Sequence, residues 1–281
     1  METFFPTICN ALAALMCVGL AIVVLARNHT KITHRMFAVL AVNLSLWAAA
    51  VAMVIQTDTD ASATFWVTFT EMVACFLPAV TYHFVCYFPR GRFEGNRWIL
   101  GALYLCATVL AVLAPTELYI KDVQVVPGYP PRAEHGPAFA VLGVMILTAL
   151  LAVHNNLRGK GSRTEGQDRR QAQFVLFGIY SISVLSILGI LGAEMFGKII
   201  LQAYLPVSTT LFAGFFAYAM IRFHLLDTRM LVSKAIVNAI MGAVVLGVFL
   251  ALAALGQRLE GGGMRPVNTG AAILTTVFVV I

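Results

Sequence analysis

The chain has 281 residues, of which 60% are hydrophobic and only 11% are charged. A soluble domain carries roughly 25% charged residues, so this composition excludes a soluble enzyme, a disordered tail and a nucleic-acid-binding module. The apolar stretches are about 20 residues long, which suits membrane-spanning helices rather than the alternating strands of a barrel. The net charge of +6, from 19 Lys and Arg against 13 Asp and Glu, is typical of basic cytoplasmic loops.

The apolar pattern predicts an all-α fold, a polytopic membrane helix bundle. Nine apolar stretches have the approximate limits 4–26, 36–56, 64–88, 97–115, 137–157, 173–196, 203–222, 234–256 and 270–281. A helix as short as the ninth spans about 18 Å, less than the hydrocarbon core of ~30 Å. We interpret this stretch as a helix truncated at residue 281, rather than as a re-entrant segment. We therefore expect a seven-helix bundle over 1–227, followed by two further transmembrane helices over 228–281.

Basic residues are distributed unevenly between the predicted helices. Fourteen of the 19 lie in or beside the loops 27–35, 90–97, 158–170 and 222–234, and five lie on the other side. By the positive-inside rule, the N-terminus is outside and these four loops are cytoplasmic. The outer segment 116–136 contains three prolines, which predicts an irregular cap. The inner segment 154–171 is basic and rich in glycine, which predicts a flexible surface loop.

Glu71 is the clearest polar residue at membrane depth. It lies seven residues into the third predicted helix, about 10 Å below the outer edge. Helical spacing places Glu71 on one stripe with Cys75, Pro78 and Tyr82, and Pro78 removes a helical hydrogen bond, which favours a kink. We interpret the stripe as the wall of a ligand pocket in the outer half of the membrane. The alternative is a carboxyl group that is protonated or bonded to a neighbouring threonine hydroxyl.

Two residues on other helices are further candidates for ligand binding. Trp47 lies deep in the second predicted helix, away from the interfacial belt of aromatic residues. Polar groups near it, Asn43 and Ser45, are explained as well by bonds between neighbouring helices. Glu194 lies at the outer end of the sixth predicted helix, where solvation at the interface is the alternative explanation.

Several chemistries are excluded. No lysine lies within a predicted span, which argues against a retinal Schiff base, and HExxH and GxSxG motifs are absent. All five cysteines fall in apolar stretches without the spacing of a metal site, so we interpret them as small buried side chains. We predict no catalytic residue, no metal and no cofactor in this chain.

Three segments together resemble one family. These are FLPAVTYHFVCYFPRGR (76–92), DRRQAQFVLFG (168–178) and FAYAMIRFHLLD (216–227). They are similar to the end of the third helix, the entry to the sixth helix and the closing motif of the N-terminal seven-transmembrane sensor region of bacterial sensor histidine kinases. The resemblance covers about residues 1–230. It implies a sensor in the bacterial cytoplasmic (inner) membrane, a homodimer, and output through a kinase module to a response regulator in a two-component system. Nine spans with an external N-terminus also resemble certain quorum-sensing kinases for acyl-homoserine lactones.

The sequence leaves alternatives to this function open. We expect a small amphiphilic ligand in the outer half of the bundle, within surrounding membrane lipid. Arg222 and Asp227 could pair across the exit from the seventh helix and, with Pro78, relay helix motion; a simple membrane anchor is the other explanation. The leading rival is a transporter or channel with a site at Glu71 and Pro78. A sensor region that drives a diguanylate cyclase is a third reading.

Overall fold

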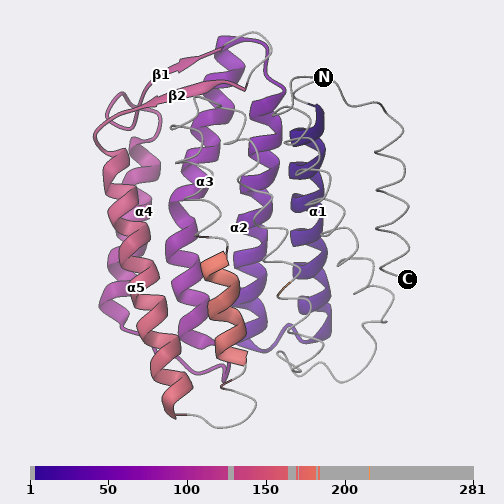
Figure 1. The fold of residues 1–281 in the computed structure, drawn as a ribbon, viewed down its shortest axis with the longest axis vertical. Helices are drawn as coiled ribbons and strands as arrows, with labels where there is room; N and C mark the ends of the chain where they lie inside the picture. Colours follow the sequence, from indigo (N-terminus) through magenta and orange to yellow (C-terminus); the bar gives the residue numbers. More distant parts are fainter. Residues whose placement is uncertain are drawn as a thin grey trace, which may run out of the picture. The chain divides into compact units, whose positions relative to one another are not determined.

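The computed structural model describes residues 4–125, 130–163, 169, 171–181, 183 and 215. Contacts divide the chain into two units, Met1–Thr228 and Arg229–Ile281, and every described residue belongs to the first. Five helices and a hairpin follow one another in this part (Figure 1): α1 (Phe4–Arg27), α2 (Ile32–Ile55), α3 (Asp60–Tyr87), α4 (Arg97–Leu113), β1 (Ile120–Gln124), β2 (Arg132–His135) and α5 (Phe139–Arg163). Residues 171–181 and 183 are also helical.

The described helices confirm a polytopic helical bundle. Four of them are long and apolar enough to cross a membrane, over Pro6–Ala26, Ile32–Ile55, Asp60–Tyr87 and Phe139–Lys160. Helix α4 is shorter, with 17 residues, and reaches about 26 Å at 1.5 Å per residue. The first five predicted stretches therefore correspond to five observed helices, and residues 171–181 lie at the start of the sixth. The seventh, eighth and ninth stretches lie outside the described residues, apart from helical Phe215.

Small and polar side chains allow α1, α2 and α3 to approach closely. Ala13 and Ala14 of α1 pack against Ala48 of α2 in a buried cluster. The Ser45 hydroxyl donates to the Ala14 carbonyl at 2.9 Å, and the Asn43 amide donates to the Val73 carbonyl at 3.4 Å. These bonds satisfy polar groups that would be costly to leave unpaired in lipid.

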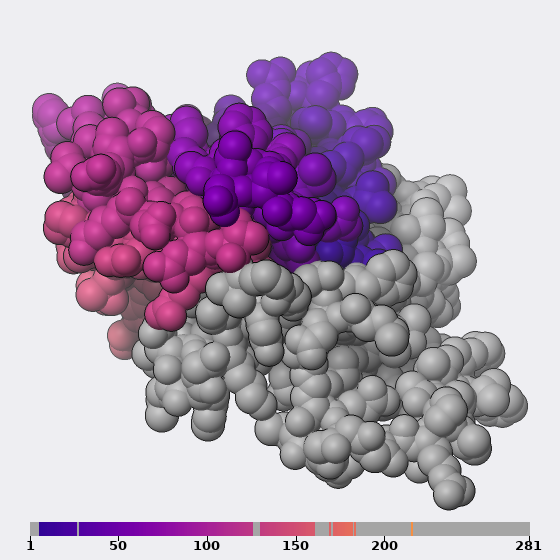
Figure 2. Space-filling view, turned by 90° about the horizontal axis from the view of Figure 1, so that it is seen from above, coloured from indigo at the N-terminus to yellow at the C-terminus, as the bar shows by residue number. Residues whose placement is uncertain are grey.

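Helix α3 is the central element, since it contacts α2, α4, α5 and β1. The Thr59 side chain accepts a hydrogen bond from the Ser62 amide at the start of α3. Pro78 is buried inside α3, and the helix continues through it to Tyr87. One end of the bundle carries the β1–β2 hairpin, and we call it the hairpin end. There the magenta atoms of the α4 and hairpin region lie beside the purple atoms of α3 (Figure 2).

Two loop predictions were wrong in part. The segment 116–136 contains an antiparallel hairpin that pairs Val123 with Ala133 and Gln124 with Arg132, rather than a wholly irregular cap. Helix α5 continues to Arg163, so residues 154–163 are helical and not a flexible loop. The glycines at 159 and 161 lower helix propensity by about 1 kcal/mol each relative to alanine, but tertiary contacts described below offset that cost.

Candidate functional site

The Glu71 carboxylate is the centre of a polar cluster in the half of α3 nearer the hairpin. Because α3 begins at Asp60, Glu71 lies eleven residues into the helix and not seven as predicted. The Tyr119 hydroxyl, from the turn between α4 and β1, donates to Glu71 Oε2 at 3.1 Å and lies 3.5 Å from Cys75 Sγ. Cys75 and Tyr119 are fully buried, whereas the Glu71 side chain is 20% exposed. Burial, together with the adjacent carboxylate, raises the pKa of Tyr119. Tyr119 therefore stays protonated and acts as a fixed donor to Glu71.

His135, the last residue of β2, approaches Glu71 from the hairpin. Its Nε2 atom lies 3.6 Å from Glu71 Oε1, and its side chain is 31% exposed. That distance is too long for a hydrogen bond but suits an ion pair when the imidazole is protonated. The imidazole ring stacks on Phe139 of α5 at 3.8 Å between ring centres, and Phe139 in turn makes an edge contact with Tyr119.

Gly136 allows the hairpin and the α4–β1 turn to meet. Its amide donates to the Tyr119 carbonyl at 2.8 Å, and the Ala138 amide donates to the Leu118 carbonyl at 2.9 Å. A Cβ atom at position 136 would overlap the backbone of Glu117 and Leu118. Because Gly136 has no side chain, the two segments can approach closely, and His135 and Tyr119 both lie next to the Glu71 carboxylate.

The four residues of the predicted stripe all lie on α3, but the structure divides them between two ends. Cys75 belongs to the Glu71 cluster. Tyr82 is buried about 16 Å further along the helix, at 1.5 Å per residue, where its hydroxyl accepts a hydrogen bond from the Asn96 amide at 3.0 Å. A ligand that contacts both Glu71 and Tyr82 would have to span about 16 Å along α3. Pro78 lies buried between them.

The other candidates lie elsewhere. Trp47 is half-buried on α2. Glu194, Arg222 and Asp227 lie outside the described residues. Their assignment as ligand or relay residues therefore stays a prediction.

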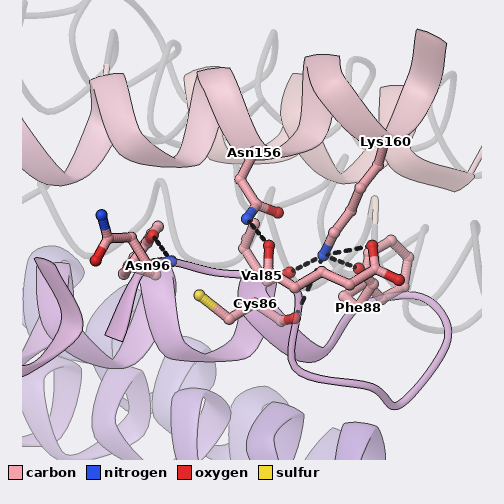
Figure 3. Close-up of polar contacts among 8 residues, drawn as sticks. Val85, Cys86, Phe88, Asn96, Asn156 and Lys160 are labelled. Carbon is pink, nitrogen blue, oxygen red and sulfur yellow. Dashed lines mark hydrogen bonds and ion pairs between the residues drawn. The ribbon is translucent and has the colours of Figure 1, made fainter. Parts of the chain in front are cut away.

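A second polar cluster lies at the opposite end of α3, and Figure 3 shows it. Lys160 of α5 is only 7% exposed. Its ammonium group donates to the carbonyls of Val85, Cys86 and Phe88 at 2.8, 3.4 and 2.7 Å and lies 3.9 Å from Glu94 Oε2. The C-terminal end of a helix carries partial negative charge, so a cation is favourable there. We call this group the Lys160 clasp.

The Lys160 clasp corrects one prediction. The lysine was counted among exposed loop residues and no lysine was expected within a span, but Lys160 is the last residue of the candidate span Phe139–Lys160. One turn earlier, the Asn156 amide donates to the Glu94 carbonyl at 2.6 Å (Figure 3). Gly95 follows Glu94 in the chain, and a Cβ atom at position 95 would overlap Cys86 Sγ.

Sequence reasoning found Glu71 but missed its partners. Tyr119 and His135 lie 48 and 64 positions away, and neither has a local pattern that marks it. The signal for the clasp was present as a basic residue three residues beyond the predicted apolar stretch 137–157, on the face of Val153 and Leu157, which are buried. The five cysteines are free and mostly buried, as predicted. Within the described residues, no group of three His, Cys, Asp or Glu side chains could hold a metal ion.

A comparison of the sequence with protein families found a match over most of the chain. The family model for the N-terminal 7TM region of histidine kinase matches residues 10–229. The chain belongs to this family. The match confirms the resemblance drawn from the three sequence segments, and it identifies the chain as a membrane sensor region of a histidine kinase that acts in signal transduction. No curated protein and no solved structure matches the chain.

Proposed function

We propose that this region binds a small amphiphile at the hairpin end of α3 and relays its binding to a cytoplasmic kinase module. The observation that carries the proposal is the convergence of Tyr119 and His135 on Glu71. Their elements, the α4–β1 turn and β2, come from outside α3. A ligand group that competes for the carboxylate would therefore change how the hairpin and the α4–β1 turn sit on α3.

Such competition provides the differential affinity that a switch requires. A ligand shifts an equilibrium only by the difference between its affinities for the two states. A hydroxyl or amide of the ligand would bond Glu71 in the state where His135 has moved away, while its apolar chain would lie between helices. Cys75 lines the same position. Trp47, Tyr82 and Glu194 stay proposed as contacts for the remainder of a longer ligand.

The proposal includes an arrangement in the membrane. We place the N-terminus and the hairpin outside, seven spans over 1–227 and two more over 228–281, in the cytoplasmic membrane of a bacterium. The 14-to-5 distribution of basic residues supports this orientation. The kinase would act as a homodimer within the lipid and phosphorylate a response regulator. Labelling of loop 158–170 by an impermeant reagent added outside intact cells would contradict the orientation.

Arg222, Asp227 and Pro78 are the proposed relay residues. Pro78 lies between the two polar clusters of α3. Arg222 and Asp227 flank the predicted exit of the seventh helix. In the natural full-length kinase, Arg222→Ala and Asp227→Ala should uncouple phosphotransfer from the stimulus without changing membrane abundance. Phosphotransfer that follows wild type in both variants would leave the pair with only an anchoring role.

Glu71 variants test the ligand site. The purified chain in detergent would be titrated with 1-dodecanol and with an N-dodecanoyl-homoserine lactone, and its melting curve would be recorded in parallel. Glu71→Leu should weaken binding about 5- to 150-fold, the effect of leaving a buried polar partner unsatisfied. Because Tyr119 donates to Glu71, this variant should also melt earlier. Glu71→Gln keeps an acceptor for Tyr119 and should lose affinity while melting nearly as wild type.

Glu117→Gln is the matched control, since Glu117 is an exposed carboxylate at the same end of the bundle. It should bind both probes as wild type does. Equal affinities of Glu71→Leu and wild type would end the assignment of Glu71 as a ligand contact. An absence of saturable binding by either probe would remove the amphiphile as the ligand.

A further inference from the structure

Glu71 and His135 have opposite charges only when the carboxyl group is ionised and the imidazole is protonated. A carboxylate is ionised throughout the neutral range, but histidine is the side chain that gains or loses its proton between pH 5 and 8. His135 Nε2 lies 3.6 Å from Glu71 Oε1 and has no hydrogen-bond partner among the described residues. Attraction between the two side chains therefore depends on the proton of the imidazole.

We infer that Glu71 and His135 form a proton-controlled latch, which holds the hairpin against α3 in acid and releases it in alkali. The proton is then a signal read by the same site to which the proposed function assigns the ligand. This inference rests on that function for the outward orientation of the hairpin and for the coupling to a kinase.

Few titratable groups among the described residues lie around the latch. On α3 the neighbour is Cys75, and α4 contributes Cys106, which lies close to Cys75. The α4–β1 turn contributes Tyr119, whose hydroxyl stays protonated. From α5 the contact is the uncharged ring of Phe139.

Charges on the hairpin itself are occupied elsewhere. Lys121 and Glu134 pair with each other at 3.6 Å, and both side chains are more than half exposed. The Asp122 carboxylate accepts a hydrogen bond from the Val123 amide. Arg132, on β2, is exposed. Among the described groups that face Glu71, His135 is therefore the only one that belongs to the residue type able to gain or lose a proton between pH 5 and 8.

Release of the latch would leave the hairpin intact. The hairpin is joined to the α4–β1 turn by the main-chain bonds of Gly136 and Ala138, which do not involve Glu71. Among the described contacts, the Tyr119 hydrogen bond alone would then continue to tie this unit to the Glu71 side chain. A change of one proton could thus alter how firmly the hairpin rests on α3 without unfolding it.

Hydrogen–deuterium exchange of the chain in lipid nanodiscs tests the latch. Exchange of hairpin amides 120–124 and 132–135 would be measured at pH 5.5 and pH 8, each rate being divided by the intrinsic rate at that pH. Wild type should show protection about two- to fivefold greater at pH 5.5, since partly exposed ion pairs contribute modestly. His135→Gln and Glu71→Gln should each abolish the difference, and His29→Gln, at the opposite end of the bundle, should retain it.

Two results would overturn the latch: equal protection of the wild-type hairpin at both pH values, or a difference that persists in both His135→Gln and Glu71→Gln. Use of two variants guards against a folding defect in either one, and melting curves at pH 8 identify such a defect. The proposed function is judged separately, by probe binding to Glu71 variants at constant pH 8. A negative exchange result would contradict the latch but not the ligand site. An absence of probe binding would contradict the ligand site but not the exchange result.

Discussion

The two halves of α3 hold ionisable groups in opposite ways. At the hairpin end, Glu71 and His135 are partly exposed and lie 3.6 Å apart. At the other end, Lys160 is 7% exposed and donates to three main-chain carbonyls. A buried charge costs several kcal/mol unless hydrogen bonds satisfy it, so the clasp is stable only when it is complete. The Glu71 and His135 side chains are partly exposed, so the loss of their contact should cost less.

This difference predicts which end can move. The Lys160 clasp joins α5, the C-terminal end of α3 and the following loop, and breaking it would leave a buried ammonium group without partners. The hairpin cluster can lose one contact at little cost. We therefore expect a stimulus to change the hairpin end while the clasped end keeps α3 and α5 in register.

Removal of the lysine should give the largest effect on stability. Lys160→Met keeps an unbranched apolar chain but removes the donor to Val85 and Phe88, whose carbonyls then lie buried without it. The free energy of unfolding should fall by about 2–4 kcal/mol. Thermal melting and denaturant titration of the chain in detergent would measure it.

The control for that variant is Lys121→Met, which removes an exposed lysine from the surface pair with Glu134. We expect a change of no more than about 0.5–1 kcal/mol. Similar losses in the two lysine variants would mean that the clasp is not a buried anchor, and the contrast between the ends of α3 would disappear.

Removal of the Tyr119 hydroxyl should have an intermediate effect. Tyr119→Phe keeps the ring packed on Phe139 but removes the donor to the Glu71 carboxylate, which should cost about 1–2 kcal/mol. The loss should be the same from pH 6 to pH 9, because the raised pKa of Tyr119 keeps the hydroxyl protonated across that range.

Tyr87→Phe provides the comparison for this tyrosine. Tyr87 makes ring contacts with His83 and Phe93, and no described group forms a hydrogen bond with its hydroxyl. Its substitution should change the free energy of unfolding by less than about 0.5 kcal/mol. A Tyr119→Phe effect that grew or vanished with pH would show that the hydroxyl is not a fixed donor.

Features of the fold and of the site could be predicted where the sequence signal is local, and could not be predicted where residues far apart in the chain come together. Apolar stretches of about 20 residues mark spans directly, and the limits of the first five agree with the observed helices to within four residues, except that α5 ends six residues later than predicted. Glu71 and Cys75 were found together because both lie on one helix with a spacing of four. Tyr119 and His135 could not be found in this way, because they come from a segment with three prolines and reach Glu71 only through tertiary folding.

For Lys160, the local sequence gives a clear signal, but that signal predicts the wrong structure. Its basic, glycine-rich surroundings predict a loop by composition, whereas the helix continues because the lysine and Asn156 both find partners in the α3–α4 loop. Local propensity is a weak prior, which a few buried hydrogen bonds can outweigh. Charge in a short segment at a membrane boundary therefore does not distinguish an exposed loop from a clasp.

The smallest expected effects come from the helix caps, which again differ between the two ends. Asn96, close to the Lys160 clasp, accepts hydrogen bonds from the Trp98 and Ile99 amides at 2.9 and 3.4 Å. Thr59, at the hairpin end, accepts one from Ser62 at 3.4 Å. Asn96→Ala should cost about 1 kcal/mol and Thr59→Ala about 0.5 kcal/mol, because the loss of a cap scales with the hydrogen bonds it satisfies. Exchange of amides in the first turn of α4 and of α3 would measure each loss locally. A larger loss at Thr59 than at Asn96 would contradict the view that the clasped end is the more firmly held.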